Sequence, residues 1–301
     1  RKLLLSLEGG RISEYNRLLG ECDYDDFILS MDYMPENPAR QPARLKVRIS
    51  LETARFPRDV FNTRSREIGA RDFLARTFMS SAARFLNFAP GQKSIKAVIE
   101  RPGAEILETS AVVTGNQEIE ARFTVDLPTR RDRIMGSAAA DFFLTALPKV
   151  IRGTFFFRNI NGDGLADWIE ANEDADAARD MLAEHGLVAF IADGSVLTGT
   201  KSREMRLNAP GPVAFIAPEE LAVTLDLPNR GKVRGMGVPK GITLIIGAGG
   251  QGKSTLLRAL ELGVYNHIPG DGRELAVTAG DAAGIRAEEG RRIENVDISL
   301  E

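Results

Sequence analysis

One segment of the chain carries residue types whose spacing is suited to holding phosphate groups. Gly247-Ala-Gly-Gly-Gln-Gly-Lys-Ser254 matches the pattern G-x-x-x-x-G-K-[ST]. Glycines let successive backbone N–H groups curl around phosphates, in a shape that side chains would block. The lysine of this pattern reaches the β- and γ-phosphates of a nucleotide, and the hydroxyl after it can hold Mg²⁺. We therefore predict a nucleotide site made by Gly247, Ala248, Gly249, Gly250, Gln251, Gly252, Lys253, Ser254 and Thr255, with Ser254 as the magnesium ligand.

The segments on both sides of this loop are of the kinds that must position it. Ile242-Thr-Leu-Ile-Ile246 is a short apolar run of β-forming residues that leads into the glycines, which predicts a strand. Residues 254–262 have helical spacing, with Leu256, Leu257 and Leu260 available to bury against a sheet. A helix that begins after Gly252 directs its positive end at bound phosphate. The order of strand, loop and helix favours a phosphate-binding loop over a glycine-rich turn.

Hydrolysis needs more than this loop, because an acidic residue must hold Mg²⁺ and orient or activate water. Only 46 residues follow Thr255, and none of them forms an apolar run that ends in Asp-Glu. Asp281-Ala-Ala-Gly284 resembles a GTPase switch, but no N-K-x-D guanine signature accompanies it, and Asp297 ends only a weak strand-like run. The sequence therefore identifies no catalytic residue.

The rest of the chain predicts an α/β protein of two parts. We expect an arginine-rich, mixed α/β N-terminal domain over residues 1–157 and a P-loop domain over 158–301, which the family resemblance described below identifies as the first part of an ABC-class ATPase domain, with the break at the Asn-, Gly- and Asp-rich segment 158–164. Period-two alternation and helical spacing predict the elements. The expected strands are 27–31, 45–51, 96–101, 121–127, 187–192, 222–227 and a basic strand ending at 235; the expected helices are 66–87, 133–147 and 165–185.

Composition excludes several classes of protein. Apolar residues make up 43% and charged residues 27% of the 301, which is typical of a folded domain. The longest apolar runs, such as residues 187–192, are far shorter than the roughly 18 residues of a membrane span, so we expect no membrane insertion. Cys22 is the single cysteine, which fits a reducing compartment, and we expect a cytoplasmic protein. With two histidines and one cysteine, a zinc site is not expected.

Positive charge is concentrated in the first part of the chain. Residues 40–101 hold fourteen Lys or Arg against five Asp or Glu, although the whole chain has a net charge of −3. Arginines can bind nucleic-acid phosphates, or they can form a solvated face above a core of phenylalanines such as Phe78 and Phe85. Thr129-Arg-Arg-Asp-Arg133 adds three arginines at an expected helix start. The candidate nucleic-acid contacts are Arg64, Arg66, Arg130 and Arg131.

Three runs together resemble a known family. Residues 241–260 around the loop, Gly263-Val-Tyr-Asn-His-Ile-Pro-Gly-Asp-Gly-Arg-Glu274 and Ile285-Arg-Ala-Glu-Glu-Gly-Arg291 are similar to the predicted ATPases of the ABC class, which stand alone without transporter spans. The resemblance implies ATP with Mg²⁺, head-to-tail pairing of two copies through their nucleotide sites, and a link to RNA. It also implies that the signature loop and acidic strand end lie beyond Glu301, as in a C-terminally truncated member.

These observations lead to one prediction and two alternatives. We expect Mg·ATP binding, with hydrolysis by the full-length protein that is coupled to RNA or other nucleic acid. The first alternative is a nucleic-acid-binding module, RNA or DNA, whose P-loop is regulatory or idle. The second is a small-molecule kinase, which shares the P-loop but needs an acceptor pocket that the sequence does not identify.

Overall fold

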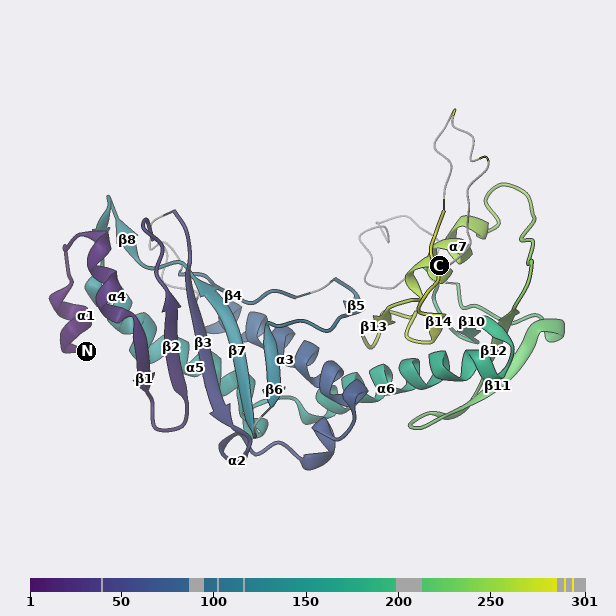
Figure 1. Cartoon of the computed structure of the whole chain (residues 1–301), viewed down its shortest axis with the longest axis horizontal. Helices are drawn as coiled ribbons and strands as arrows, with labels where there is room; N and C mark the ends of the chain where they lie inside the picture. The colour runs from purple at the N-terminus through teal and green to yellow at the C-terminus, as the bar shows by residue number, and fades with distance from the viewer. Residues whose placement is uncertain are drawn as a thin grey trace. The chain divides into compact units, whose positions relative to one another are not determined.

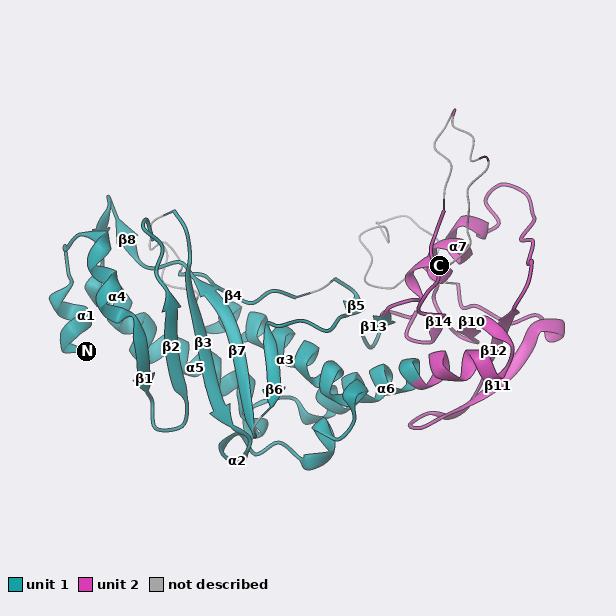
Figure 2. Cartoon of the chain, in the orientation of Figure 1, with its two compact units in different colours: residues 1–176, 266–270 teal, residues 177–265, 271–301 magenta. Residues whose placement is uncertain are grey.

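The computed structural model describes residues 1–38, 40–86, 95–101, 103–115, 117–198, 213–285, 290 and 294. These residues form two compact units, the first made of residues 1–176 and 266–270 and the second of residues 177–265 and 271–301 (Figure 2). Helix α6 (Gly162–Glu184) contributes residues to both units.

A six-stranded antiparallel sheet forms the first unit's framework (Figure 1). Its strand order is β1-β2-β3-β7-β4, and β6 also pairs with β7. The strands are β1 (Gly20–Asp23), β2 (Ile28–Tyr33), β3 (Ala43–Ser50), β4 (Ala97–Val98), β6 (Val112–Gly115) and β7 (Glu118–Val125). Alternate residues of β3 and β7 are buried, so the period-two patterns of the sequence correctly predicted these strands.

Helices cover the apolar face of this sheet. Phe78 of α3 (Arg64–Phe85) packs against Phe123 of β7 with ring centroids 5.0 Å apart, and against Phe155 of α5 (Leu147–Phe155) at 6.2 Å. Phe78 is therefore a core residue, and its interpretation as part of a phenylalanine core is confirmed. The shorter helical elements are α1 (Lys2–Ser6), η1 (Ile12–Leu18), α2 (Leu51–Ala54), η2 (Arg58–Phe61), α4 (Gly136–Asp141), η3 (Phe142–Ala146) and η4 (Phe157–Asn159).

One expectation about local structure in the first unit is wrong, and one helix begins earlier than expected. Residues 129–134 do not begin a helix: β8 (Thr129–Arg130) and β9 (Arg133–Ile134) form a hairpin, and helix starts only at Gly136. Helix α6 begins at Gly162, whereas the sequence predicted a helix over residues 165–185. The Asn161 side chain accepts the Gly164 N–H at 3.2 Å, which satisfies a backbone donor that a helix start leaves unpaired.

The second unit contains a four-stranded antiparallel sheet in the order β11-β12-β10-β14. Its strands are β10 (Leu187–Ala192), β11 (Ala222–Leu227), β12 (Gly231–Pro239) and β14 (Ala276–Thr278). A short helix, η5 (Glu219–Leu221), precedes β11, and α7 (Lys253–Leu262) packs beside β14.

The chain leaves the second unit briefly after α7. Residues 266–270 belong to the first unit (Figure 2), where β13 (Asn266–His267) pairs with β5 (Glu105–Ile106). The buried Asn266 amide donates to Oδ1 of Asn172 at 2.8 Å and to Oδ1 of Asp176 at 2.7 Å. A five-residue segment close to the phosphate loop in sequence is therefore held by hydrogen bonds in the N-terminal unit.

Candidate nucleotide-binding site

The predicted phosphate loop lies at the N-terminus of α7. Gly250 and Gly252 have φ angles of +78° and +84°, in the left-handed region that favours glycine, and Gly252 is the residue from which the helix starts. Lys253 is the first residue of α7 and Ser254 the second, so their side chains stand beside the unpaired N–H groups of the first turn. The loop is exposed to solvent, where an anion can reach it.

Two internal contacts occupy the polar groups of the loop. The Ala248 N–H donates to Oε1 of Gln251 at 2.8 Å, and Nζ of Lys253 donates to the Ala248 carbonyl at 2.6 Å. The Gln251 side-chain oxygen thus accepts a hydrogen bond from a backbone N–H of the loop, and such an N–H is the kind of group that binds a phosphate oxygen. A nucleotide that uses the Ala248 N–H and the Lys253 ammonium must replace both contacts.

Packing in the second unit fixes the direction of α7. Leu256 and Leu260 pack against a small core, as the sequence predicted, and Ala259 is buried. That core consists of Ile191, Ala217, Met236 and Ala276. Leu257 does not bury with them, since 62% of it is exposed.

The C-terminal end of α7 is held by hydrogen bonds. Thr278 Oγ1 donates to the Leu260 carbonyl at 2.8 Å, and Arg179 of α6 donates to the carbonyls of Gly263 and Thr278 at 3.2 and 3.1 Å. The cation also interacts favourably with the negative end of the helix. Gly263 has no space for a side chain, because a Cβ there would lie 2.6 Å from Thr278 Oγ1.

The expectation of a strand over residues 242–246 is wrong. This segment has no strand partner among the described residues, and Ile242, Leu244 and Ile246 are exposed. Backbone N–H and C=O groups of a strand need a neighbouring strand, and β-forming composition cannot supply one. The described sheet of the second unit provides none for this segment.

Ser254 is the magnesium ligand that the sequence predicts. Its side chain is exposed at the start of α7, and no three His, Cys, Asp or Glu side chains gather into a metal site anywhere in the described chain. Asp281 is exposed, and Asp297 lies outside the described residues. A serine hydroxyl fits Mg²⁺ when phosphate oxygens and water complete its octahedral shell.

The four candidate nucleic-acid contacts have different environments. Arg66 donates to Glu173 at 2.9 Å and only 13% of its side chain is exposed, while Arg64 pairs with Glu67 at 2.8 Å and also with Glu108. Arg130 and Arg131 are exposed on the β8–β9 hairpin and pair with no carboxylate of the described chain. The structure thus leaves the hairpin arginines available and engages the two helix arginines.

Sequence reasoning missed three features of this region. The contact from Gln251 to Ala248 could not be found, because the pattern G-x-x-x-x-G-K-[ST] leaves that position open. Arg179 lies 84 residues before its partner Gly263, and no local signal links it to α7. The polar cluster around Asn266 joins residues about 90 positions apart, which only the fold brings together.

Comparison with known proteins adds family information. A family model described as the N-terminal domain of ATPases of the ABC class matches residues 1–158, and the P-loop domain model of the same class matches residues 161–300. The chain is 42% identical over 108 residues to an uncharacterized protein of Methanocaldococcus jannaschii, a match that covers 33% of this chain and 24% of that protein. The matched stretch thus spans about a quarter of the relative's length. None of the described helices is long and apolar enough to cross a bilayer.

Proposed function

The chain belongs to the ATPases of the ABC class, and we propose that its phosphate loop binds Mg·ATP. The observation that carries this proposal is the loop itself: glycines at positive φ, a helix that starts at Lys253, and a backbone N–H and an ammonium that lie together at its start. In this proposal the loop amides and Lys253 neutralise phosphate oxygens, Ser254 ligates Mg²⁺, and Thr255 contacts the nucleotide. We further propose a boundary between the two domains near residue 158.

Mg²⁺, when bound, would withdraw charge from the transferring phosphoryl group. We propose that hydrolysis belongs to the longer protein and takes place between two copies paired head to tail, where a partner would complete each site. A reducing, cytoplasmic setting fits the free thiol of Cys22 on β1.

A displacement assay tests the nucleotide class and the role of Ser254. A fluorescent ATP analogue bound to the chain should be displaced by ATP more effectively than by GTP. Chelation of Mg²⁺ should weaken binding to the wild type, and Ser254→Ala should abolish that dependence while its metal-free affinity stays the same. An unchanged magnesium dependence in Ser254→Ala would remove this hydroxyl from the metal site.

The β8–β9 hairpin favours a second function, binding of RNA or DNA. Its turn residues Arg131 and Asp132 have φ angles of 49° and 57°, a conformation that costs a non-glycine residue about 1–2 kcal/mol. An isolated bridge between Arg11 and Arg133 joins the hairpin to the N-terminal segment. Exposed arginines on an anchored, strained turn are suited to contact with phosphates of a nucleic-acid backbone.

Salt dependence tests this second function. Affinity for a single-stranded RNA oligonucleotide, measured by fluorescence anisotropy, should fall steeply as salt rises. The double variant Arg130→Gln/Arg131→Gln should lower the log–log slope by about 1.4, at about 0.7 per phosphate contact. Arg64→Gln is the matched control and should leave the slope unchanged, because its guanidinium already binds Glu67 and Glu108. Equal slopes for all three proteins would mean that the hairpin arginines do not contact the phosphates of the RNA.

A further inference from the structure

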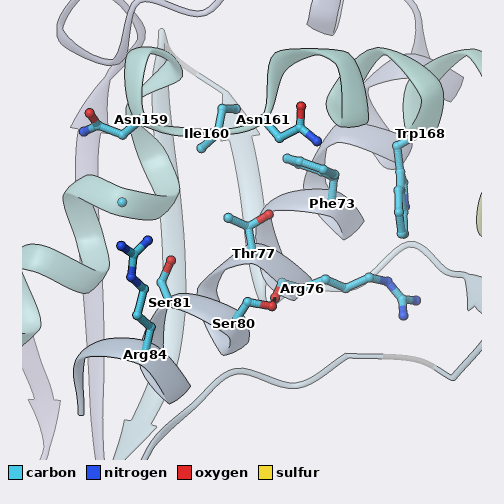
Figure 3. A pocket seen from close by; sticks show the side chains of 11 residues that line it. Phe73, Arg76, Thr77, Ser80, Ser81, Arg84, Asn159, Ile160, Asn161 and Trp168 are labelled. Atoms are coloured by element: carbon cyan, nitrogen blue, oxygen red, sulfur yellow. Dashed lines mark hydrogen bonds between the residues drawn. The ribbon is translucent and has the colours of Figure 1, made fainter. Parts of the chain in front are cut away.

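An open cleft of about 400 Å³ lies in the first unit. Helix α3 forms one wall, α5 forms the second, and the segment that leads into α6 closes the third side (Figure 3). Its lining includes Phe73, Thr77, Ser81, Arg84, Gly153 and Trp168. Its volume is within the range of small-molecule sites.

One face of α3 presents hydrogen-bond donors to this cleft. Thr77, Ser81 and Arg84 are spaced four and three residues apart, which places them one above the other on the helix surface. Figure 3 shows the polar ends of Ser81 and Arg84 pointing the same way. Within the described chain, the side-chain hydroxyls of Thr77 and Ser81 make no hydrogen bond, and Arg84 makes no ion pair, since its guanidinium only lies over the Phe85 ring at 5.1 Å.

The charge of the cleft is positive. Neither Asp nor Glu is among its lining residues. The other lining cation, Arg76, is neutralised by the buried carboxylate of Asp72. This carboxylate accepts hydrogen bonds from Nε of Arg76 at 2.6 Å and from Nε1 of Trp168 at 2.9 Å. The charge of Arg84 is therefore left for a ligand.

The opposite end of the cleft is aromatic. Phe73 and Trp168 meet edge to face with centroids 5.7 Å apart, and Arg76 lies 5.7 Å from the Trp168 ring. Ile160 adds an aliphatic surface. Such a wall favours a flat, apolar group in a ligand.

We propose that this cleft binds a small organic phosphate that carries an aromatic ring, with the phosphate at Thr77, Ser81 and Arg84 and the ring against Phe73 and Trp168. A tetrahedral phosphate has oxygens for all three donors, and a guanidinium is suited to it. This site is separate from the phosphate loop, which belongs to the second unit.

Trp168 provides a direct readout, because it is the only tryptophan in the chain. Phenyl phosphate titrated into the protein should change Trp168 fluorescence in a saturable way. Inorganic phosphate should compete for the same site, and phenol at the same concentrations should have no effect. Arg84→Gln should weaken binding about tenfold, the usual effect of losing one charged hydrogen bond.

Gly153 allows a steric test with a matched control. A Cβ at this position would lie 3.5 Å from Ser81 Oγ and from the Phe85 ring, in ordinary contact, so Gly153→Ala should fold and retain binding. Gly153→Met should fill the cleft and abolish binding. Lys253→Ala, which alters the other phosphate site, should leave the fluorescence titration unchanged. No saturable change in the wild type, or a change that Arg84→Gln and Gly153→Met both leave intact, would overturn the proposal.

Discussion

Replacing Gln251 by alanine should tighten the binding of Mg·ATP. In the structure the Gln251 side-chain oxygen accepts the Ala248 N–H at 2.8 Å, so a phosphate must break this hydrogen bond before the amide is free. A neutral hydrogen bond contributes about 0.5–1.5 kcal/mol net, and the exposure of this loop places the contact at the lower end of that range. The expected gain in affinity is therefore about twofold to fivefold.

Isothermal titration calorimetry of the wild type, Gln251→Ala and Gln251→Glu measures this effect. Gln251→Glu is the matched variant that should lower the affinity for Mg·ATP, because its carboxylate keeps a hydrogen-bond acceptor near Ala248 and repels phosphate. We expect the affinity for Mg·ATP to follow the order alanine, glutamine, glutamate. An alanine variant that binds as weakly as the glutamate variant would mean that Gln251 contacts the nucleotide, and would refute its role as an internal competitor.

Three further predictions concern stability. Gly263→Ala should lower the free energy of unfolding by about 1–3 kcal/mol in urea titrations, because its Cβ would lie 2.6 Å from Thr278 Oγ1. Arg66→Gln should also lower the free energy of unfolding, by about 1–3 kcal/mol, because the half-buried carboxylate of Glu173 loses this ion pair. Arg131→Gln is the control, and it should change the free energy of unfolding by less than about 0.5 kcal/mol. The hydrogen bond from Arg152 lowers the pKa of Asp26. This pair therefore stabilises the fold at pH values above the ordinary carboxyl pKa of about 3.9, and the stabilisation is lost as the pH falls through the lowered pKa of the folded state. The urea midpoint of Arg152→Met should therefore differ from that of the wild type more at pH 7 than at pH 2.

The sequence was informative where local pattern decides local structure. Alternation predicted β3 and β7, because one face of each strand is buried and the other is not. Helical spacing predicted α3 and most of α6. Gly250 and Gly252 have positive φ angles, which glycine adopts readily, and their contact with phosphate stays a prediction.

The sequence was uninformative where a partner distant in the chain decides the structure. Residues 242–246 have strong β-forming composition, yet a strand forms only when another strand pairs with it. Arg131 and Asp132 adopt a hairpin turn usually made by Asn-Gly or Asp-Gly, so residue preference pointed to a helix start instead. Asn266 joins the first unit through hydrogen bonds to α6 that no local window contains.

Calorimetric titration of the chain with Mg·ATP, beside Lys253→Ala, tests the central claim most directly. In the proposed site the Lys253 ammonium exchanges its contact with the Ala248 carbonyl for contacts with phosphate, so we predict binding by the wild type and none by the variant. Circular dichroism of both proteins controls for folding, because Lys253 is partly exposed and its truncation leaves the packing of α7 intact. Equal affinity of the two folded proteins for Mg·ATP would contradict the assignment of the nucleotide site to this loop.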